Sequence, residues 1–412
     1  MLHPGELQNC NSCGFCQAAC PIYRLTRHEG SCARGHTSHL KALLSGGVQP
    51  DDKVRAHFAE CLTCRACTAN CPPGVKTDRI VVEGRSRLLA ARRSRLERLI
   101  FEKVLPNPAL FRRGMSLLGL GNRPPAQPLL FLMRRLAVLP EGLQRATDML
   151  PRPSGGFLHE RLARLGTMTS AARRELVYFM SCGMNYLRPD AGEATLRVLR
   201  ALGWNVVVVE NVCCGLPAYV SGDIDSARRM ARQNLTLFSQ HRGPIVSDCA
   251  SCSSFLKEYE QLVGEEAAGF AAQVKDFTEL AVEAWPPKLS STKAPQTVTY
   301  HDPCHLSRYQ NLRGQPRELL KGLPGHEFRE LPEADWCCGG AGTYAIKHPR
   351  LSNKVLARKM NNLRSTNADI LTTACPGCLL QLEYGVRKHR LPVRVAHISQ
   401  LLAETLHEKD ST

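Results

Sequence analysis

Eight cysteines near the start of the chain fall into two copies of one spacing. Each copy follows the pattern C-x2-C-x2-C-x3-C-P, with Pro21 closing the first copy and Pro72 the second. Thiolates at this spacing bind [4Fe-4S] clusters. The two copies therefore predict two such clusters and a role in electron transfer. The first copy consists of Cys10, Cys13, Cys16 and Cys20, and the second of Cys61, Cys64, Cys67 and Cys71.

The same spacing predicts that the two copies exchange a ligand. Two-residue gaps let a tight turn direct three thiolates at three corners of one cluster, whereas the fourth cysteine, beside a rigid proline, reaches toward the neighbouring cluster. We therefore assign the ligands in crossed sets. One cluster takes Cys10, Cys13, Cys16 and Cys71, and the other takes Cys61, Cys64, Cys67 and Cys20.

Two other uses of these cysteines are weaker interpretations. Structural zinc also takes C-x2-C pairs, but it needs four ligands in a closed tetrahedron and rarely uses this triplet with a trailing Cys-Pro. A disulfide framework belongs to small secreted scaffolds, and this chain has 412 residues and 19 cysteines. The cysteines therefore indicate metal binding.

Length and composition restrict the architecture and the location. A prior of roughly 150 residues per domain predicts two to four domains. The first ten residues, MLHPGELQNC, hold no basic region followed by an apolar stretch, and no run reaches the roughly 18 apolar residues that a membrane-spanning helix needs. Reduced thiolates fit the cytoplasm. We expect a cytoplasmic protein, peripheral on the inner face of the cell membrane if its basic segment binds lipid.

That basic segment lies between Gly84 and Arg174. It contains 18 Lys and Arg against 5 Asp and Glu, so it holds +13 of the net charge of +17. Its Leu-rich stretches at 85–100, 111–125 and 128–140 predict short basic amphipathic helices. Docking to a partner subunit or to anionic lipid is the favoured interpretation, and a solvated linker is the alternative. We expect no nucleic-acid binding, because interleaved aromatic residues are missing.

A second cysteine pattern occupies the rest of the chain and is also duplicated. In each copy a single cysteine is followed by Cys-Cys-Gly and then by C-x2-C, with intervals of 31, 35 and 3 positions in the first copy and 33, 37 and 3 in the second. A duplicated ancestral unit explains this. The first CCG unit carries Cys182, Cys213, Cys214, Cys249 and Cys252, and the second CCG unit carries Cys304, Cys337, Cys338, Cys375 and Cys378.

The cysteines of the CCG units follow apolar, β-leaning runs such as NVVVVENV and DILTTA, with helical segments between the runs. This alternation predicts parallel strands that are buried on both faces. Cysteines at the carboxyl ends of such strands gather at the edge where open α/β sheets bind ligands. A buried thiol set or a structural zinc is the alternative, although five thiolates exceed what tetrahedral zinc uses.

The predicted fold class is a multidomain α+β and α/β protein. A mainly helical ferredoxin-like domain precedes two duplicated α/β CCG domains with parallel strands. The expected divisions are 1–83 for the two-cluster domain, 84–174 for the basic helical linker region, 175–290 for the first CCG domain and 291–412 for the second.

The stretches CLTCRACTANCPPGV, CCGGAGTYAIKHPRL and NKVLARKMNNL carry a resemblance to a known family. The chain resembles the glycolate oxidase iron-sulfur subunits over nearly its whole length, and its CCG units resemble those of heterodisulfide reductase and of lactate-utilisation proteins. The resemblance implies an oxidoreductase subunit. In that family a 2-hydroxy acid, glycolate or lactate, is oxidised at a flavin on FAD-containing partner subunits, and the iron-sulfur subunit passes electrons to a membrane acceptor such as quinone.

All ten CCG cysteines are present, as in the heterodisulfide reductase type. By that resemblance, one or both units bind a further, noncubane [4Fe-4S] cluster through five cysteines. The resemblance also implies an alternative function, in which the CCG region itself catalyses thiol-disulfide reduction. A zinc-bearing interaction protein is a third alternative. No catalytic residue is identified, since Ser/His/Asp sets and phosphate-binding loops are missing.

A few residues beside the cysteines have expected roles. Cys32 stands outside every motif and is expected to be a small buried residue. His301 and His305 flank Cys304 and either gate protons or form structural hydrogen bonds, with hydrogen bonding favoured. Asp302 and Pro303 fix the loop that carries Cys304. The glycines of the Cys-Cys-Gly turns are expected to bring the backbone close to a cluster, and they are Gly215, Gly339, Gly340 and Gly342.

Overall fold

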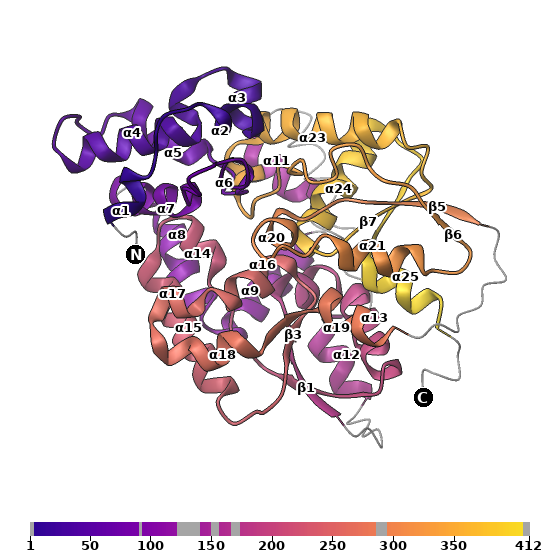
Figure 1. The fold of residues 1–412 in the computed structure, drawn as a ribbon. Coiled ribbons are helices and arrows are strands. Elements are labelled where there is room, and N and C mark those ends of the chain that lie inside the picture. The colour runs from indigo at the N-terminus through magenta and orange to yellow at the C-terminus, as the bar shows by residue number, and fades with distance from the viewer. Residues whose placement is uncertain are drawn as a thin grey trace.

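The computed structural model describes most of the chain. Figure 1 shows an N-terminal helical domain packed against two α/β units. The fold class predicted from the sequence is confirmed. The described residues are 4–89, 93–121, 141–149, 156–165, 174–285 and 295–406.

The N-terminal domain is built of short helices, because its cysteine turns interrupt the chain every few residues. Its apolar core lies between α4, α5 and α7 and includes Leu40, Phe58 and Ile80, each of which is fully buried. The helix α5 begins where the Asp51 carboxylate accepts a hydrogen bond from the Val54 N–H at 2.7 Å. The elements are α1 Pro4–Gln8, α2 Phe15–Ala19, α3 Pro21–Thr26, η1 Glu29–Ser31, α4 Ala33–Leu44, α5 Asp52–Glu60, α6 Ala66–Ala69 and α7 Thr77–Leu89.

The first CCG unit contains a four-stranded parallel sheet in the order β2-β1-β3-β4. Val177 of the central strand β1 pairs with Val207 of β2 and with Ile245 of β3. The strands are β1 Arg174–Phe179, β2 Trp204–Val209, β3 Ile245–Ser247 and β4 Val274–Asp276. The helices are η4 Gly183–Leu187, α13 Pro189–Ala201, α14 Leu216–Val220, α15 Ile224–Phe238, α16 Ala250–Lys257, α17 Tyr259–Val263, η5 Glu265–Ala267, α18 Ala268–Gln273 and α19 Phe277–Ala284.

The second CCG unit repeats this topology, with the parallel order β6-β5-β7-β8. Val298 of β5 pairs with Phe328 of β6 and with Ile370 of β7, as Val177 does with its neighbours in the first sheet. The strands are β5 Gln296–Tyr300, β6 His326–Phe328, β7 Ile370–Thr373 and β8 Arg394–His397. The helices are α20 Cys304–Ser307, α21 Gly314–Lys321, α22 Tyr344–Lys347, α23 Pro349–Arg364, α24 Pro376–His389 and α25 Ile398–Glu404.

The linker region is helical where it is described, and part of its positive charge is buried inside the protein. Two of its arginines are buried: Arg85 donates to the carbonyl groups of Phe58 and Val220, and Arg145 donates to Gln381. The helix expected at 128–140 lies outside the described residues. The elements are α8 Arg95–Leu99, the π-helix η3 Ile100–Val104, α9 Pro108–Gly121, α11 Glu141–Met149 and α12 Leu158–Leu165. Of the helices described, none has the length and apolar character needed to cross a membrane.

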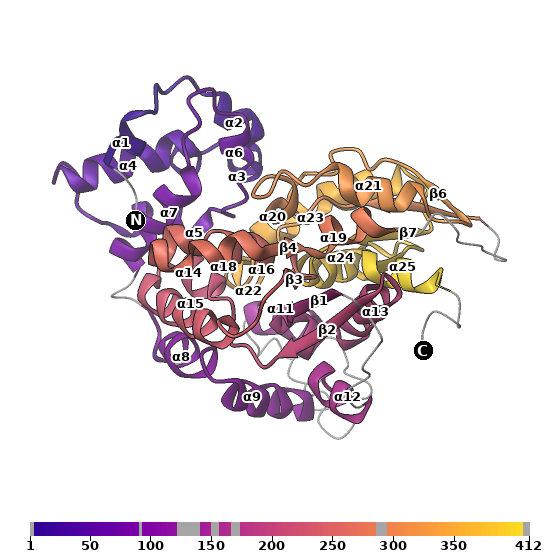
Figure 2. The same ribbon diagram turned by 60° about the horizontal axis from the view of Figure 1, so that its bottom comes forward.

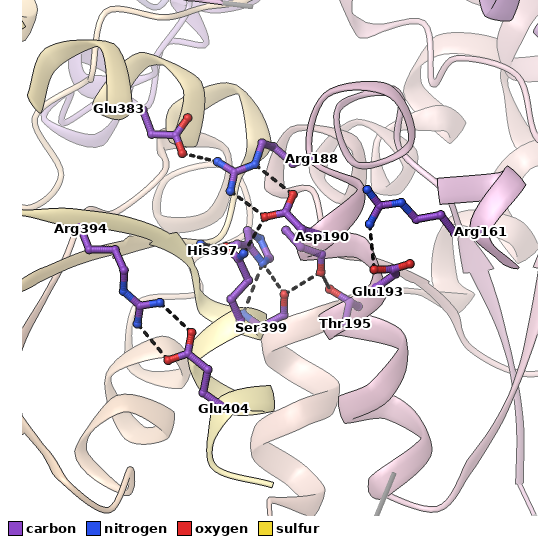
Figure 3. Close-up of polar contacts among 12 residues, drawn as sticks. Arg161, Arg188, Asp190, Glu193, Thr195, Glu383, Arg394, His397, Ser399 and Glu404 are labelled. Carbon is purple, nitrogen blue, oxygen red and sulfur yellow. Dashed lines mark hydrogen bonds and ion pairs between the residues drawn. The ribbon is translucent and has the colours of Figure 1, made fainter. Parts of the chain in front are cut away.

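The two CCG units share one apolar core, and a polar seam joins them at one side (Figure 2). Helices α13 and α25 pack together, and the Ser399 hydroxyl of α25 donates to the Ala191 carbonyl of α13 at 3.0 Å. Arg188 of the first unit pairs with Asp190 and also with Glu383 of the second unit (Figure 3). The two units therefore hold each other in a fixed orientation.

The domain divisions expected from the sequence stay predictions. Helix α7 runs from Thr77 to Leu89 and so continues through the expected division after residue 83. Helices α3 and α23 pack together, as do α7 and α14, so the N-terminal domain contacts both CCG units. This places the cysteine turns of the N-terminal domain beside the cysteines of the CCG units.

Candidate iron-sulfur sites

The two cysteine triplets of the N-terminal domain have the same unusual backbone. In each triplet, the residue before and the residue after the middle cysteine adopt positive φ: Ser12 at 56° and Gly14 at 88° flank Cys13, and Thr63 at 49° and Arg65 at 54° flank Cys64. Three of these four residues carry side chains, for which this conformation is unfavourable. Two left-handed residues in each turn curl the chain so that three thiols face one centre.

Backbone N–H groups also point at sulfur atoms in these turns. The Tyr23 N–H donates to Cys20 Sγ at 3.4 Å where α3 begins at Pro21, and the Thr63 N–H donates to Cys61 Sγ at 3.4 Å. Hydrogen bonds to sulfur stabilise the negative charge of a thiolate and help to set the potential of a bound cluster. The turns therefore provide polar contacts for charged sulfur in an otherwise apolar setting.

The fourth cysteine of each copy lies beside the triplet of the other copy. Cys71 lines one small cavity together with all three cysteines of the first triplet, namely Cys10, Cys13 and Cys16. The pKa of the Cys20 thiol is raised above its ordinary value, first by burial and then by the neighbouring thiols of the second triplet, which are those of Cys61, Cys64 and Cys67. Helices α2 and α6, which carry Cys16 and Cys67, pack side by side. Cys67 of the second triplet lines the same cavity as well, and the crossed ligand sets stay a prediction.

Cys32 is fully buried, as expected, but it does not lie apart from the motifs. Its thiol lies beside the thiol of Cys16 in the first triplet. Nothing in the sequence indicated this contact, because Cys32 belongs to neither cysteine pattern. It directly follows the short helix η1. The contact places a ninth thiol beside the eight of the two copies.

The ten CCG cysteines gather at the carboxyl ends of the strands, as the alternation of strands and helices predicts. In the first unit neighbouring thiols follow one another from Cys182 to Cys213, then to Cys214, Cys252 and Cys249. In the second unit they follow from Cys304 to Cys337, then to Cys338, Cys378 and Cys375. The Cys338 and Cys378 sulfur atoms are 3.5 Å apart. All ten side chains are buried or partly buried.

Two further contacts join these groups into one series. The Cys249 thiol of the first unit lies beside the Cys375 thiol of the second. The Cys337 thiol of the second unit in turn lies beside the Cys64 thiol of the N-terminal domain. The second CCG unit therefore lies between the second triplet and the first CCG unit.

Arg65 holds the second triplet in this position. Its guanidinium pairs at 2.8 Å with Asp78 of α7 and at 2.8 Å with Glu258 of the first CCG unit, and it lies 3.6 Å from the centre of the Tyr309 ring in the second. The Tyr309 hydroxyl donates to the Thr63 carbonyl at 2.6 Å. One residue of the triplet thus contacts its own domain and both CCG units.

Two glycines of the Cys-Cys-Gly turns adopt positive φ and lie close to the backbone of a neighbouring helix. Gly215 has φ 91° and Gly339 has φ 81°, and a Cβ atom on Gly339 would lie 2.9 Å from the Ser352 carbonyl oxygen of α23. On Gly215 it would lie 3.2 Å from the Ala227 carbonyl oxygen of α15. These glycines therefore let each turn pack on the helix that follows, while Gly340 does not adopt positive φ.

The donor set fits iron-sulfur clusters. Burial raises the pKa of the Cys61 thiol to about 11, although the Arg85 charge opposes the rise. A buried thiol of this kind loses its proton readily only when a metal cation binds the thiolate that forms. The sulfur atoms gather in groups of four and five, all nineteen cysteines are free of disulfides, and the N–H groups near them suit thiolates.

Comparison with known proteins agrees with this chemistry. A family described as a 4Fe-4S dicluster domain matches residues 6–75, and one described as a cysteine-rich domain matches residues 176–257 and 298–383. The probable glycolate oxidase iron-sulfur subunit of Bacillus subtilis is 34% identical over 99% of this chain and 96% of its own length. The chain belongs to the family of glycolate oxidase iron-sulfur subunits.

Two further relatives show how far the likeness extends. The glycolate oxidase iron-sulfur subunit of Escherichia coli is 31% identical over 91% of this chain and 89% of its own length. Lactate utilization protein A of a Geobacillus species is 30% identical over 54% of this chain and 97% of its own length. The chain is thus an iron-sulfur subunit of the oxidoreductase class, with cysteine-rich domains shared by glycolate and lactate proteins.

Proposed function

We propose that this chain is the electron-carrying subunit of a flavin-dependent 2-hydroxy-acid dehydrogenase, with glycolate as the first candidate substrate and lactate as the second. It accepts electrons from FAD-containing partner subunits and passes them to a membrane acceptor of the quinone type. The observation that carries this proposal is the unbroken series of buried thiols that runs from the second triplet through Cys64 and Cys337 to Cys375 and Cys249.

The ligands follow the crossed sets. Cys10, Cys13, Cys16 and Cys71 hold one [4Fe-4S] cluster, and Cys61, Cys64, Cys67 and Cys20 hold the other; when bound, such clusters supply one-electron transfer. The five cysteines of one or both CCG units hold a further noncubane cluster. The left-handed turns orient the thiolates, and the N–H groups of Tyr23 and Thr63 stabilise their charge.

The docking surface lies on α8 and α9 of the linker region. Leu96 and Leu99 of α8 and Leu117 and Leu118 of α9 are each more than half exposed. The exposed arginines of the same two helices are Arg95, Arg98 and Arg113. Apolar side chains next to positive charge suit either a partner subunit or the anionic surface of a membrane.

The test is anaerobic purification of the chain with its partners. Brown protein, with iron and acid-labile sulfide in similar amounts, is the expected product, and glycolate should reduce its clusters only when the FAD-containing subunits are present. A colourless protein that holds zinc would contradict the proposal. Reduction of the isolated chain by glycolate would place the oxidation on this chain and would contradict it as well.

The second candidate function is thiol-disulfide reduction in the CCG region. Its support is the contact between Cys249 and Cys375, which puts thiols of the two units against each other beside the Ser251 hydroxyl, 3.3 Å from Cys375 Sγ. Chemically reduced protein would then reduce a small disulfide without any flavin subunit. If the disulfide survives while quinone is reduced, the electron-carrier proposal is preferred.

A further inference from the structure

One buried histidine lies among the thiols of the second CCG unit without a structural reason to be there. The ligand atoms of His301, Cys338 and Cys378 all lie within 4.8 Å of one another. His301 is 1% exposed, and neither of its ring nitrogens has a hydrogen-bond partner among the residues that the structure describes. A buried imidazole without partners loses the hydrogen bonds that water would give it, which is costly.

Other buried histidines of the chain do not share this property. His305 accepts or donates a hydrogen bond at 2.9 Å between Nδ1 and the Ser254 hydroxyl, and His397 has the Ser399 hydroxyl 2.8 Å from its Nδ1. His36 bonds the His57 carbonyl through Nε2 at 2.9 Å. Structural hydrogen bonding, the role favoured from the sequence for both His301 and His305, therefore describes His305 and not His301.

The fold fixes the position of His301 firmly. It follows the last residue of β5, its N–H donates to the Thr372 carbonyl of β7 at 2.9 Å, and its own carbonyl accepts from the Thr373 hydroxyl at 3.2 Å. These bonds hold it between the two central strands, where the strand order reverses and open α/β sheets bind ligands. Cys338 comes from the Cys-Cys-Gly turn and Cys378 from the first turn of α24. Three separate elements thus bring the three donors together.

We propose that His301 is a ligand of the metal centre held by the second CCG unit, beside Cys338 and Cys378. The proposal rests on the proposed function in one respect, namely that this unit holds iron. Neutral imidazole is a good iron ligand, and a shared pair of nitrogen and sulfur donors is known chemistry for iron-sulfur centres. Ligation gives the buried ring the partner that the protein does not provide.

The charges around His301 agree with this role. Lys359 is fully buried, with its ammonium group donating to the Ala334 carbonyl at 3.0 Å, and Asp302 is bound by Arg317 at 2.8 Å. Both charged groups thus have other partners, and neither ring nitrogen of His301 has a hydrogen-bond partner among the described residues, which leaves the ring a lone pair for a metal.

The first CCG unit offers no such donor at the matching place. Met180 follows the last residue of β1 as His301 follows that of β5, so the two units differ in the residue that ends the first strand. Replacing anionic thiolate by neutral imidazole raises the reduction potential of an iron-sulfur centre. We therefore expect the metal centre of the second CCG unit to have a higher reduction potential than a centre bound by cysteines alone.

The test uses the full chain, purified without air with its iron in place and with its histidines labelled with nitrogen-15. Pulsed EPR of the reduced protein should show the strong nitrogen coupling of a directly bound imidazole, and the label should change its frequency. His301→Ala should remove this coupling, whereas the matched control His305→Ala, on the other side of Cys304, should keep it. His301→Cys should lower the reduction potential of the same centre, because a thiolate would replace the imidazole. A merely structural role of His301 predicts no such change. This variant also keeps the test decisive if His301→Ala fails to fold.

The outcomes separate this inference from the proposed function. More than eight iron atoms per chain without a His301-dependent coupling would overturn the ligand assignment and leave the electron-carrier function standing. About eight iron atoms and no coupling would overturn both the assignment and the CCG centre, eight being the content of two [4Fe-4S] clusters. Failure to assemble any cluster would contradict the proposed function itself.

Discussion

The thiols of Cys249 and Cys375 lie beside each other across the boundary between the two CCG units. The two cysteines are equivalent, because each precedes the helix that follows the third strand of its unit, α16 in the first and α24 in the second. The backbone continues the contact, with the Ala250 N–H donating to the Ala374 carbonyl at 3.1 Å. The duplicated units therefore meet at their ligand-binding edges, so that metal centres in the two units would be neighbours.

The crossed ligand sets predict the effect of Cys20→Ser. The variant should lose the cluster whose triplet is Cys61, Cys64 and Cys67, with a fall of up to about four iron atoms, because the Cys20 thiol lies near the thiols of that triplet. Anaerobic EPR and iron analysis measure the loss. Cys32→Ala is the matched control, since Cys32 is a buried cysteine that is not a proposed ligand. Two intact, interacting [4Fe-4S] signals in Cys20→Ser would contradict the assignment.

The CCG cysteines predict iron beyond the two cubane clusters. Anaerobic protein should contain more than the roughly eight atoms that two [4Fe-4S] clusters need. Cys213→Ala combined with Cys338→Ala should bring the content down to about eight, because each residue lies in the middle of the thiol series of its unit. If the starting protein already holds about eight atoms and the double variant keeps the same absorption spectrum, the CCG units bind no cluster of their own.

Much of the fold follows from local signals in the sequence. The runs before the cysteines predicted β1, β2, β3, β5 and β7, because long apolar runs of β-branched residues can only be buried strands here. The strands β4, β6 and β8 were not predicted: β4 and β6 have three residues each, and β8 has only Val395 and Ala396 between Arg394 and His397. Edge strands this short get their identity from pairing with a neighbour, which a sequence does not display.

The candidate site also has a part that the sequence predicts and a part that it does not. The spacing of the cysteines predicted which residues gather within each motif, since that is local geometry. The contacts between motifs, from Cys64 to Cys337 and from Cys249 to Cys375, depend on how whole domains pack and could not be predicted. The contact of Cys32 with Cys16 and the position of His301 among thiols belong to the same class.

We expect the replacement of Arg65 to have a large effect on the stability of the folded protein. Arg65→Gln should destabilise the folded protein by about 3–5 kcal/mol, because it removes the charge that compensates the buried carboxylates of Asp78 and Glu258. The shift of the thermal midpoint of the iron-loaded protein measures it. Arg394→Gln is the matched control: Arg394 pairs with Glu404 on the surface, and such a pair contributes about 1 kcal/mol or less. Equal shifts for the two variants would contradict the role given to Arg65.

The exposed face of α8 and α9 predicts where the protein docks. Replacing Arg95, Arg98 and Arg113 with Gln should weaken binding to anionic vesicles or to the flavin subunits, since each basic residue near an anionic surface contributes about 1 kcal/mol. Three such changes correspond to roughly a hundredfold loss of affinity. The loss should be greatest at low salt, where Coulomb attraction is least screened.

The control for this prediction removes the same charge elsewhere. Arg242, Lys321 and Arg364 are exposed on the CCG units, and their replacement with Gln also lowers the net charge by three. If both triple variants lose affinity equally, the total charge of the protein drives binding and not the linker face. If neither variant changes copurification or vesicle binding, the linker face is a solvated surface and docking must use the CCG units. The iron content should be unchanged in every case, because none of the six residues contributes a proposed ligand.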